Sequence, residues 1–450
     1  MLIMFRKIIN FSVKIVQKYL PEPFIFAIIL TFTAFIIAIP VCNQTPLEVL
    51  DNWGGGIWSL LAFSMQMALV LVCGSALADA PIIHKGLNFL ASIPKKPVSA
   101  IALVSFVSAL ACWINWGFGL IVGVIFAKEI AKKLENVDYR LLIASAYSGF
   151  VVWHGGLSGS IPLAMATGGE ALTNVSMGVI KEPIPISETI FSLQNLIISA
   201  CVMISLVVIN SLMHPKKDSV VTIDPALLVE ENLKDKSLPV TPAEKLENST
   251  ILTILISIMG LGYLGLKIYR GGSMDLNSVI MLFLFLGILL HRRPIDYVKS
   301  MTQATVGSAG ILLQFPFYAG IMGIMTGVSA EGISLAGQIS KACISISNET
   351  TFPLLSFLSA GIVNVFVPSG GGQWAVQAPI MMPAGAALGV NPAVTGLAIA
   401  WGDAWTNLIQ PFWAIPALAI AKLGAKDIMG FCLVNLVVTG VIISIGLLCL

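Results

Sequence analysis

Asp403 is the residue whose setting in this sequence most strongly indicates chemistry. It lies in an apolar stretch that carries no other Asp, Glu, Lys or Arg between Glu349 and Lys422. A carboxylate at membrane depth costs roughly 2.5–3.5 kcal/mol even on lenient insertion scales, so such residues are paired, protonated or functional. We predict that Asp403 binds a coupling ion, either Na⁺ or a proton. A place at the rim of a watery cavity is the alternative.

Two glycine-rich tips, Asn115–Gly119 and Pro368–Gly372, interrupt apolar segments and are candidates for an anion site. Glycine allows a ligand to approach the backbone closely. A helix that starts just after each tip would direct its N–H groups and its positive dipole end at an anion. A kink without a ligand is the alternative. The candidate substrate-binding residues are Asn115, Trp116, Gly117, Gly119, Ser158, Ser160, Ser369, Gly370, Gly371, Gly372 and Gln373.

The segments that follow the tips combine helix-weakening residues with oxygen-bearing side chains. The first contains Trp153–Pro162 and the second contains Gly402–Pro411, and glycine and proline both destabilise a helix interior. Side-chain oxygens and freed carbonyls there are suited to Na⁺. The candidate ion-coupling residues are Asp403, Asn115, Ser369, Thr406, Asn407 and Gln410. For His154, a proton-gating role and a structural hydrogen bond both stay open.

The composition of the 450-residue chain places these candidates in a membrane. Hydrophobic residues make up 57% of the chain and charged residues 11%, whereas soluble domains carry about 25% charged residues. The chain is also too hydrophobic for a disordered protein, and a net charge of +2 disfavours a nucleic-acid partner. The seven cysteines form no C-x-x-C pair, so we expect no cofactor or metal apart from the coupling ion. The predicted fold class is an all-α polytopic membrane protein.

Two uncharged segments, at about 98–127 and about 350–390, differ from the rest because a tip interrupts each of them. Their arms are short for a hydrocarbon core about 30 Å thick, so we predict two re-entrant hairpins. Nine other segments then cross the bilayer, starting from a cytoplasmic N-terminus. Among the 25 lysines and arginines, those left on the outer side are Lys181, Lys267, Arg270 and Lys341. This asymmetry agrees with the positive-inside rule.

The two halves of the sequence resemble each other at a nearly constant offset. FVSALAC at 106–112 aligns with FLSAGIV at 357–363, and IASAYSGFVVWHGGLSGSIP at 143–162 aligns with LAIAWGDAWTNLIQPFWAIP at 397–416. A chance likeness between apolar helices is the alternative. Because one extra crossing lies between the halves, the second repeat is predicted to be inverted, as is typical of secondary transporters.

This repeat defines the predicted organisation of the chain. The segments are an amphipathic cytoplasmic helix over 1–20, a first transmembrane repeat over 21–213, a cytoplasmic polar loop over 214–249, a connecting transmembrane helix over 250–270, and a second, inverted transmembrane repeat over 271–450. Each repeat contains one hairpin and one broken helix. The hairpin cores hold no Lys or Arg. Because no cationic side chain is there to neutralise several negative charges, we expect a small monocarboxylate as substrate more than a di- or tricarboxylate.

A membrane enzyme and a channel are the two function classes that compete with a transporter. A membrane enzyme is disfavoured because the sequence has no G-x-S-x-G or H-E-x-x-H motif, and Gly370–Gly372 is not followed by the Gly-Lys-Ser/Thr of a P-loop. A channel stays open, since two inverted hairpins can also build a pore. The charge rings that mark many ion-selective pores are missing from the hairpins.

Five motifs resemble the bacterial short-chain fatty acid transporter family. They are INWGFGLIVG, WHGGLSGSIP, QFPFYAGI, VPSGGGQWAVQAP and QPFWAIPALAIAKLGAKDIMGF. The resemblance implies uptake of acid anions such as butyrate and acetoacetate by Na⁺ or H⁺ symport, without enzymatic activity. The family is similar in turn to the larger ion-transporter superfamily. In that superfamily, hairpins and broken helices form a mobile domain that slides as an elevator against a scaffold, often in a homodimer. Asn115 and Ser369 match that superfamily's hairpin-tip ligands, although neither tip here has its Ser-Asn-Thr triplet. The implied location is the bacterial inner membrane, with the lipid bilayer and a small carboxylate as partners.

Overall fold

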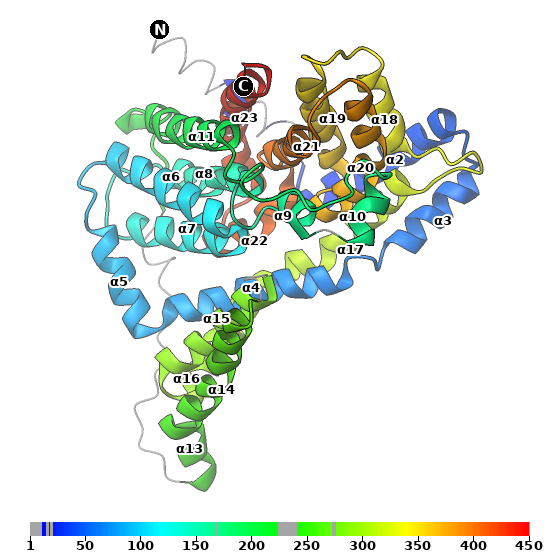
Figure 1. Ribbon diagram of the computed structural model, residues 1–450. Helices are drawn as coiled ribbons and strands as arrows, with labels where there is room; N and C mark the ends of the chain where they lie inside the picture. The colour runs from blue at the N-terminus through cyan, green and yellow to red at the C-terminus, as the bar shows by residue number, and fades with distance from the viewer. Residues whose placement is uncertain are drawn as a thin grey trace.

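The computed structural model describes residues 11–14, 18, 21–167, 169–223, 241–271 and 276–449, and in these the chain is helical and contains no strand. Figure 1 shows the arrangement of the helices. Seven segments within the described residues are long and apolar enough to cross a membrane, and four shorter apolar helices accompany them. The chain is therefore a multi-pass membrane protein, as its composition predicts.

The first half runs from α2 to α11. Proline stands at the first or second position of α2, α3, α5 and α6, where its fixed φ suits a helix start. The helices are α2 (Pro23–Cys42), α3 (Pro46–Gly56), α4 (Leu61–Asp79), α5 (Pro81–Ala91), α6 (Pro97–Ile114), α7 (Trp116–Ala131), α8 (Tyr139–Ser148), the 3₁₀ helix η1 (Gly149–Gly155), α9 (Ser160–Thr167), α10 (Glu170–Val175) and α11 (Leu193–Leu212).

The second half runs from α15 to α23 and again starts several helices with proline. The helices are α15 (Leu276–His291), α16 (Pro294–Thr305), the 3₁₀ helix η3 (Val306–Ser308), α17 (Ala309–Thr326), α18 (Leu335–Ile344), α19 (Phe352–Phe366), α20 (Gly370–Ala387), α21 (Pro392–Thr406), α22 (Pro411–Ala421) and α23 (Ala425–Cys449).

The order of elements recurs between the halves. In the first half, the α6–α7 hairpin precedes a helix that is interrupted between η1 and α9. In the second half, the α19–α20 hairpin precedes a helix that is interrupted between α21 and α22. This recurrence is what the sequence repeat predicts for the order of the elements along the chain.

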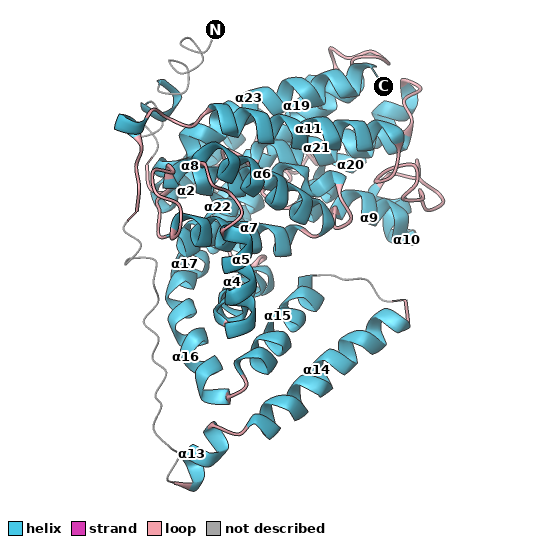
Figure 2. Cartoon of the chain, turned by 90° about the vertical axis from the view of Figure 1, so that its left-hand side faces the viewer, coloured by secondary structure: helices cyan, strands magenta, loops and turns pink. Residues whose placement is uncertain are grey.

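The segment between the halves contains η2 (Lys217–Ser219), α13 (Pro242–Glu247) and α14 (Thr250–Tyr269). Figures 1 and 2 show α13 and α14 extending away from the body of the molecule beside α15 and α16. The predicted polar loop over 214–249 includes 224–240, which lie outside the described residues, and of the predicted helix over 1–20 only 11–14 and 18 are described.

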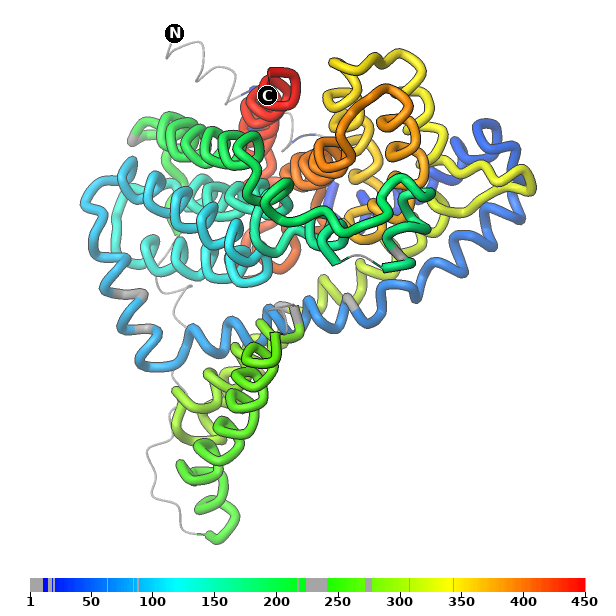
Figure 3. Tube along the Cα trace, viewed as in Figure 1, coloured from blue at the N-terminus to red at the C-terminus, as the bar shows by residue number. Residues whose placement is uncertain are grey.

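Helix α21 lies at the contact between the two halves. It packs on η1 and α9 from the first half and on α19 and α20 from the second, and Figure 3 shows these distant parts of the chain meeting. Two glycines allow the close approach of α19 and α21: a Cβ on Gly402 would lie 2.3 Å from the carbonyl oxygen of Phe357, and one on Gly361 would lie 2.9 Å from the Trp405 ring. The tight packing fixes the position of α21, which carries Asp403, against α19.

Candidate functional site

The tip of the first hairpin is shorter than predicted, because only Asn115 lies between α6 and α7. The Asn115 side chain accepts a hydrogen bond from the N–H of Phe118 at 3.0 Å, and the N–H of Trp116 donates to Ser158 Oγ at 2.9 Å. Asn115 is a favoured helix N-cap residue, so α7 begins immediately after it. Gly117 and Gly119, predicted to lie in the tip, therefore belong to the first turns of α7.

Two glycines near this tip face protein backbone. A Cβ on Gly119 would lie 2.2 Å from the backbone nitrogen of Cys112, and one on Gly156 would lie 2.1 Å from the carbonyl oxygen of Trp113. Both positions bring the first broken helix or α7 into contact with α6. In the structure these glycines permit close packing against α6, where a larger residue would clash with backbone atoms.

The tip of the second hairpin is arranged differently. Ser369 caps α20 by accepting the N–H of Gly372 at 3.3 Å. A Cβ on Gly370 would lie 2.7 Å from Cε1 of His154, whereas one on Gly371 would meet no heavy atom within 4 Å. The first turn of α20 thus touches His154 on one side and faces open space at Gly371.

Both breaks in the helices after the hairpins are held by buried polar side chains. Asn195 of α11 donates from its amide to the carbonyls of Gly155 and Ile190, each at 2.8 Å. Tyr147 donates its hydroxyl hydrogen to the carbonyl of Asn407 at 2.5 Å. Gln410, directly before α22, is 1% exposed, and its side-chain amide atoms have no hydrogen-bond partner among the described residues. The interruptions are therefore specific, hydrogen-bonded features of the protein interior.

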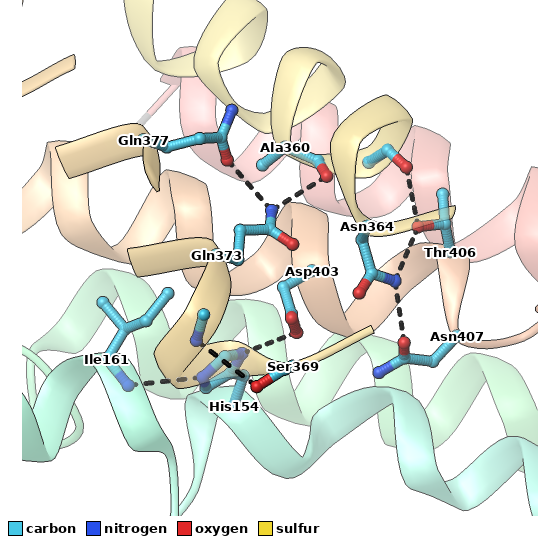
Figure 4. A network of polar contacts seen from close by, with 12 residues as sticks. His154, Ile161, Ala360, Asn364, Ser369, Gln373, Gln377, Asp403, Thr406 and Asn407 are labelled. Atoms are coloured by element: carbon cyan, nitrogen blue, oxygen red, sulfur yellow. Dashed lines mark hydrogen bonds and ion pairs between the residues drawn. The ribbon is translucent and has the colours of Figure 1, made fainter. Parts of the chain in front are cut away.

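The side chains of His154 and Asp403 lie next to each other and connect the two halves. Nδ1 of His154 lies 3.4 Å from Oδ2 of Asp403, and both side chains are 0% exposed. The backbone N–H of Ile161, in the first turn of α9, donates to Nε2 of His154 at 3.3 Å. A neutral imidazole has one donor and one acceptor nitrogen, so its proton is on Nδ1, beside the carboxylate. Figure 4 shows this pair next to Ser369.

Asn364, which was not predicted from the sequence, lies beside the predicted residues Thr406 and Asn407. It is 0% exposed, and its amide donates to Thr406 Oγ1 at 2.9 Å and to Asn407 Oδ1 at 2.7 Å. Thr406 and Asn407, predicted as ion ligands, use these oxygens to hold Asn364. The signal available in the sequence was that Asn364 is the single Asn or Gln between Asn348 and Gln373, in the apolar run before the VPSGGG tip.

Gln373 continues this polar network on α20. Its amide donates to the carbonyl of Ala360 at 2.9 Å and to Oε1 of Gln377 at 3.0 Å. Gln377, also missed from sequence, donates to Ser340 Oγ at 3.1 Å and to Ser359 Oγ at 3.2 Å. This network of hydrogen bonds connects α18, α19 and α20 next to Asp403.

The predicted residues thus fall into two groups. Asp403, Gln373, Thr406, Asn407, Ser369 and Gly370 gather around the α20 start and α21, where Figure 4 shows most of them. Asn115, Trp116 and Ser158 form the first tip, where Trp116 packs against Trp153 and Trp413 with ring centroids 5.9 and 5.2 Å apart. Ser160 begins α9. Trp153 and Trp413 were not predicted from the sequence as neighbours of Trp116. No group of three His, Cys, Asp or Glu side chains suited to a metal ion occurs in the part of the chain that the structure describes.

One family model and two known proteins each match this chain over nearly its whole length. The family model for short-chain fatty acid transporters matches residues 4–450. Two proteins named as candidate short-chain fatty acid transporters, from Haemophilus influenzae and Escherichia coli K12, are each 44% identical over 449 and 447 residues, with 99% of both chains covered.

Two solved structures are also similar. The YdaH transporter of Alcanivorax borkumensis is 17% identical with a TM-score of 0.44, covering 95% of this chain and 98% of that one. MtrF of Neisseria gonorrhoeae is 15% identical with a TM-score of 0.41, covering 96% of each chain.

The family match begins at residue 4 and ends at residue 450, so it includes both hairpins and both broken helices. The match to the two relatives likewise extends over 99% of this chain and 99% of each of them. A transporter family also argues against the membrane enzyme considered from sequence. The chain belongs to the short-chain fatty acid transporter family.

Proposed function

We propose that the protein is a secondary active transporter that imports short-chain fatty acids and similar small monocarboxylates, such as butyrate and acetoacetate, by symport with Na⁺ or H⁺. The observation that carries this proposal is the buried pair of Asp403 and His154, 3.4 Å apart at the contact between the two halves. An intramembrane carboxylate is a functional-site hypothesis by default, and family membership supplies the substrate class.

The substrate carboxylate binds at the start of α20 in this proposal. Gly371 faces open space, and the N-terminus of a helix attracts an anion through its N–H groups and its dipole. The segment between Glu349 and Lys422 contains no Lys or Arg. A site without a fixed cationic side chain favours one carboxylate, accompanied by a bound cation, over a di- or tricarboxylate.

The proposed mechanism is an elevator built from two inverted repeats. The hairpins and broken helices form the mobile domain, and the outer helices form a scaffold in a homodimer. Burial supports this division. In the apolar stretch of Tyr139–Thr167, 89% of the residues are buried, whereas in those of α2 and α14 only 22% are. The lysine and arginine distribution supports a bacterial inner-membrane protein with a cytoplasmic N-terminus.

The test is uptake of labelled butyrate into proteoliposomes under an imposed Na⁺ gradient or pH gradient. Protein-free liposomes are the control, because an acid with a pKa of about 4–5 keeps a small neutral fraction at pH 7 that crosses lipid unaided. Uptake above control driven by Na⁺ alone identifies Na⁺ symport, and uptake driven by pH alone identifies H⁺ symport. Equal flux without either gradient identifies a channel, and no uptake above control rejects butyrate as the substrate.

The voltage dependence of uptake gives the stoichiometry. One net charge moved across 100 mV supplies about 2.3 kcal/mol, which corresponds to roughly 50-fold accumulation. A 1:1 symport of a monovalent cation with a monoanion is electroneutral and gains nothing from the voltage. A second cation per cycle makes uptake electrogenic, and an imposed potential of that size then changes the accumulation ratio.

A further inference from the structure

We propose that Asp403, Asn364 and Gln373 form a binding site for one Na⁺ ion. These residues come from α21, α19 and α20, and each is 0% exposed. Oδ1 of Asp403, Oδ1 of Asn364 and Oε1 of Gln373 are buried and accept no hydrogen bond from any described residue. Buried polar atoms are normally paired. An unpaired carboxylate oxygen with two unpaired amide oxygens around it points to a cation.

The orientation of the Asn364 amide is fixed by its neighbours. Thr406 Oγ1 donates its hydrogen to the carbonyl of Gly361 at 2.8 Å, so toward Asn364 it acts as an acceptor. Asn364 must therefore present its NH₂ group to Thr406, at 2.9 Å. The Asn364 carbonyl oxygen consequently points away from Thr406, and rotation of the amide by 180° would place two acceptors against each other.

The Gln373 amide is fixed in the same way. Its Nε2 donates at 2.9 Å to the carbonyl of Ala360, and a backbone carbonyl only accepts. The second hydrogen goes to Oε1 of Gln377, whose own NH₂ is engaged by two serine hydroxyls. Gln373 thus turns its carbonyl oxygen away from Ala360.

The spacing along α19 and α21 brings these oxygens to the level of Asp403. Ala360 and Asn364 lie one turn apart on α19, as Asp403 and Asn407 do on α21. Ala360 touches α21 at Gly402, where an added Cβ would lie 2.5 Å from Cβ of Ala360, and Asn364 bonds one turn further along. Figure 4 shows the side chains of Gln373, Asn364 and His154 surrounding Asp403.

The charge and the number of acceptors favour a metal cation over a proton. His154 is neutral when Nε2 accepts the Ile161 N–H, so it leaves the charge of an ionised Asp403 uncompensated. One proton on Asp403 would serve one amide oxygen and leave the other unpaired. A monovalent cation contacts all three oxygens and cancels the single charge, and one carboxylate with neutral amides suits Na⁺ better than a divalent ion.

The site takes the role of the coupling site only if the proposed transport function holds, but binding itself is measured without substrate. Thermal unfolding of the purified full-length protein is compared in NaCl, KCl and choline chloride at equal ionic strength, with equilibrium binding of ²²Na⁺. A ligand that binds the folded state raises the melting temperature. We expect a rise of about 3 °C in NaCl at a concentration near 100 times Kd and about one ²²Na⁺ per chain.

The variants Asn364→Leu and Gln373→Leu each remove one oxygen and are expected to weaken Na⁺ binding about tenfold or more. The matched control is Asn210→Leu, because Asn210 is an equally buried amide, bonded to Ser105 and Ser148. It is expected to lower the melting temperature while keeping the Na⁺ response. If a variant does not fold, the comparison of the wild-type protein in NaCl, KCl and choline chloride still decides whether it binds Na⁺.

Identical melting in the three salts together with no ²²Na⁺ binding overturns the site, as does undiminished binding in both variants. A Na⁺ response combined with an absence of butyrate uptake leaves the cation site standing and rejects the substrate assignment. The two proposals can therefore fail separately.

Discussion

The two hairpin regions share an order of helices but differ in what their polar atoms contact. In the first, Asn115 and Ser158 satisfy N–H groups at the start of α7, and Gly119 and Gly156 lie against the backbone of α6. In the second, acceptor oxygens around Asp403 have no donor among the described residues, and Gly371 faces open space. The two regions therefore differ in whether the N–H groups and oxygens at the hairpin and helix break find partners within the protein.

This difference shows that the same order of helices in both halves does not bring the same polar contacts with it. Both hairpins place a helix start at a short tip and a broken helix beside it. The side chains at matching places differ, and in the proposed function the second region binds an ion and an anion while the first does not. We therefore expect substitutions in the second region to affect transport and those in the first to affect stability.

The largest effect is expected from Asp403→Asn, which removes the charge but keeps the shape of the side chain. Uptake of butyrate should fall by about 100-fold or more, because the bound cation loses its only charged ligand. The measurement is the initial rate in proteoliposomes under Na⁺ and pH gradients. Asp427→Asn, which alters a helix-capping carboxylate of α23, is the control and should retain uptake. A wild-type rate with unchanged ion dependence in Asp403→Asn would rule out the coupling role.

Gly371→Leu is the next most informative change. Its side chain would enter the open space at the start of α20, so we expect uptake to drop at least about tenfold with little change in melting temperature. Gly86→Leu on α5, where an added Cβ also meets nothing within 4 Å, serves as the control and should transport normally. Normal uptake by Gly371→Leu would remove the substrate site from this tip.

Gly119→Ala probes the closed region. The added Cβ would lie 2.2 Å from the Cys112 backbone nitrogen, and backbone atoms cannot move aside as a flexible side chain can. We expect a loss of about 1–3 kcal/mol of unfolding free energy, read as a lower melting temperature in detergent. The ion dependence of the folded fraction should stay that of the wild type. An unchanged melting temperature would contradict the packing role of this glycine.

Ser158→Ala should have the smallest effect. It leaves the N–H of Trp116 without its acceptor at 2.9 Å, a loss worth about 1 kcal/mol. Melting temperature and butyrate affinity are measured together: a small stability loss with unchanged affinity supports the capping role. A large loss of affinity would instead place Ser158 at the ligand and weaken the contrast between the two regions.

The sequence predicted the elements well because each leaves a local signature. Apolar runs, glycine-rich tips and proline-rich breaks fall within a few residues of the helix ends at Asn115, Ser369 and Gln410. Bilayer thickness imposes these signatures on any multi-pass chain. The extent of each tip was overestimated, because a single N-cap residue starts a helix and allows glycine inside its first turn.

The roles of individual side chains were less accessible from the sequence. Asp403 stood out because no other charge is near it along the chain. Thr406 and Asn407 were predicted to bind an ion, and the structure adds that their oxygens accept hydrogen bonds from the Asn364 amide. Which oxygen meets which donor depends on contacts between α19 and α21, at sequence separations of 42 and 43 residues.

The sequence by itself determined that this chain spans a membrane, that its two halves repeat the same order of elements, and that one carboxylate lies in an uncharged stretch. Hydrophobicity and helix-breaking residues act locally, so they can be read along the chain. The tertiary structure alone decided that His154 meets Asp403, that Gly371 and not Gly119 faces open space, and that Asn364 joins the site. Those pairings depend on the close packing of helices distant in sequence, which local pattern does not encode.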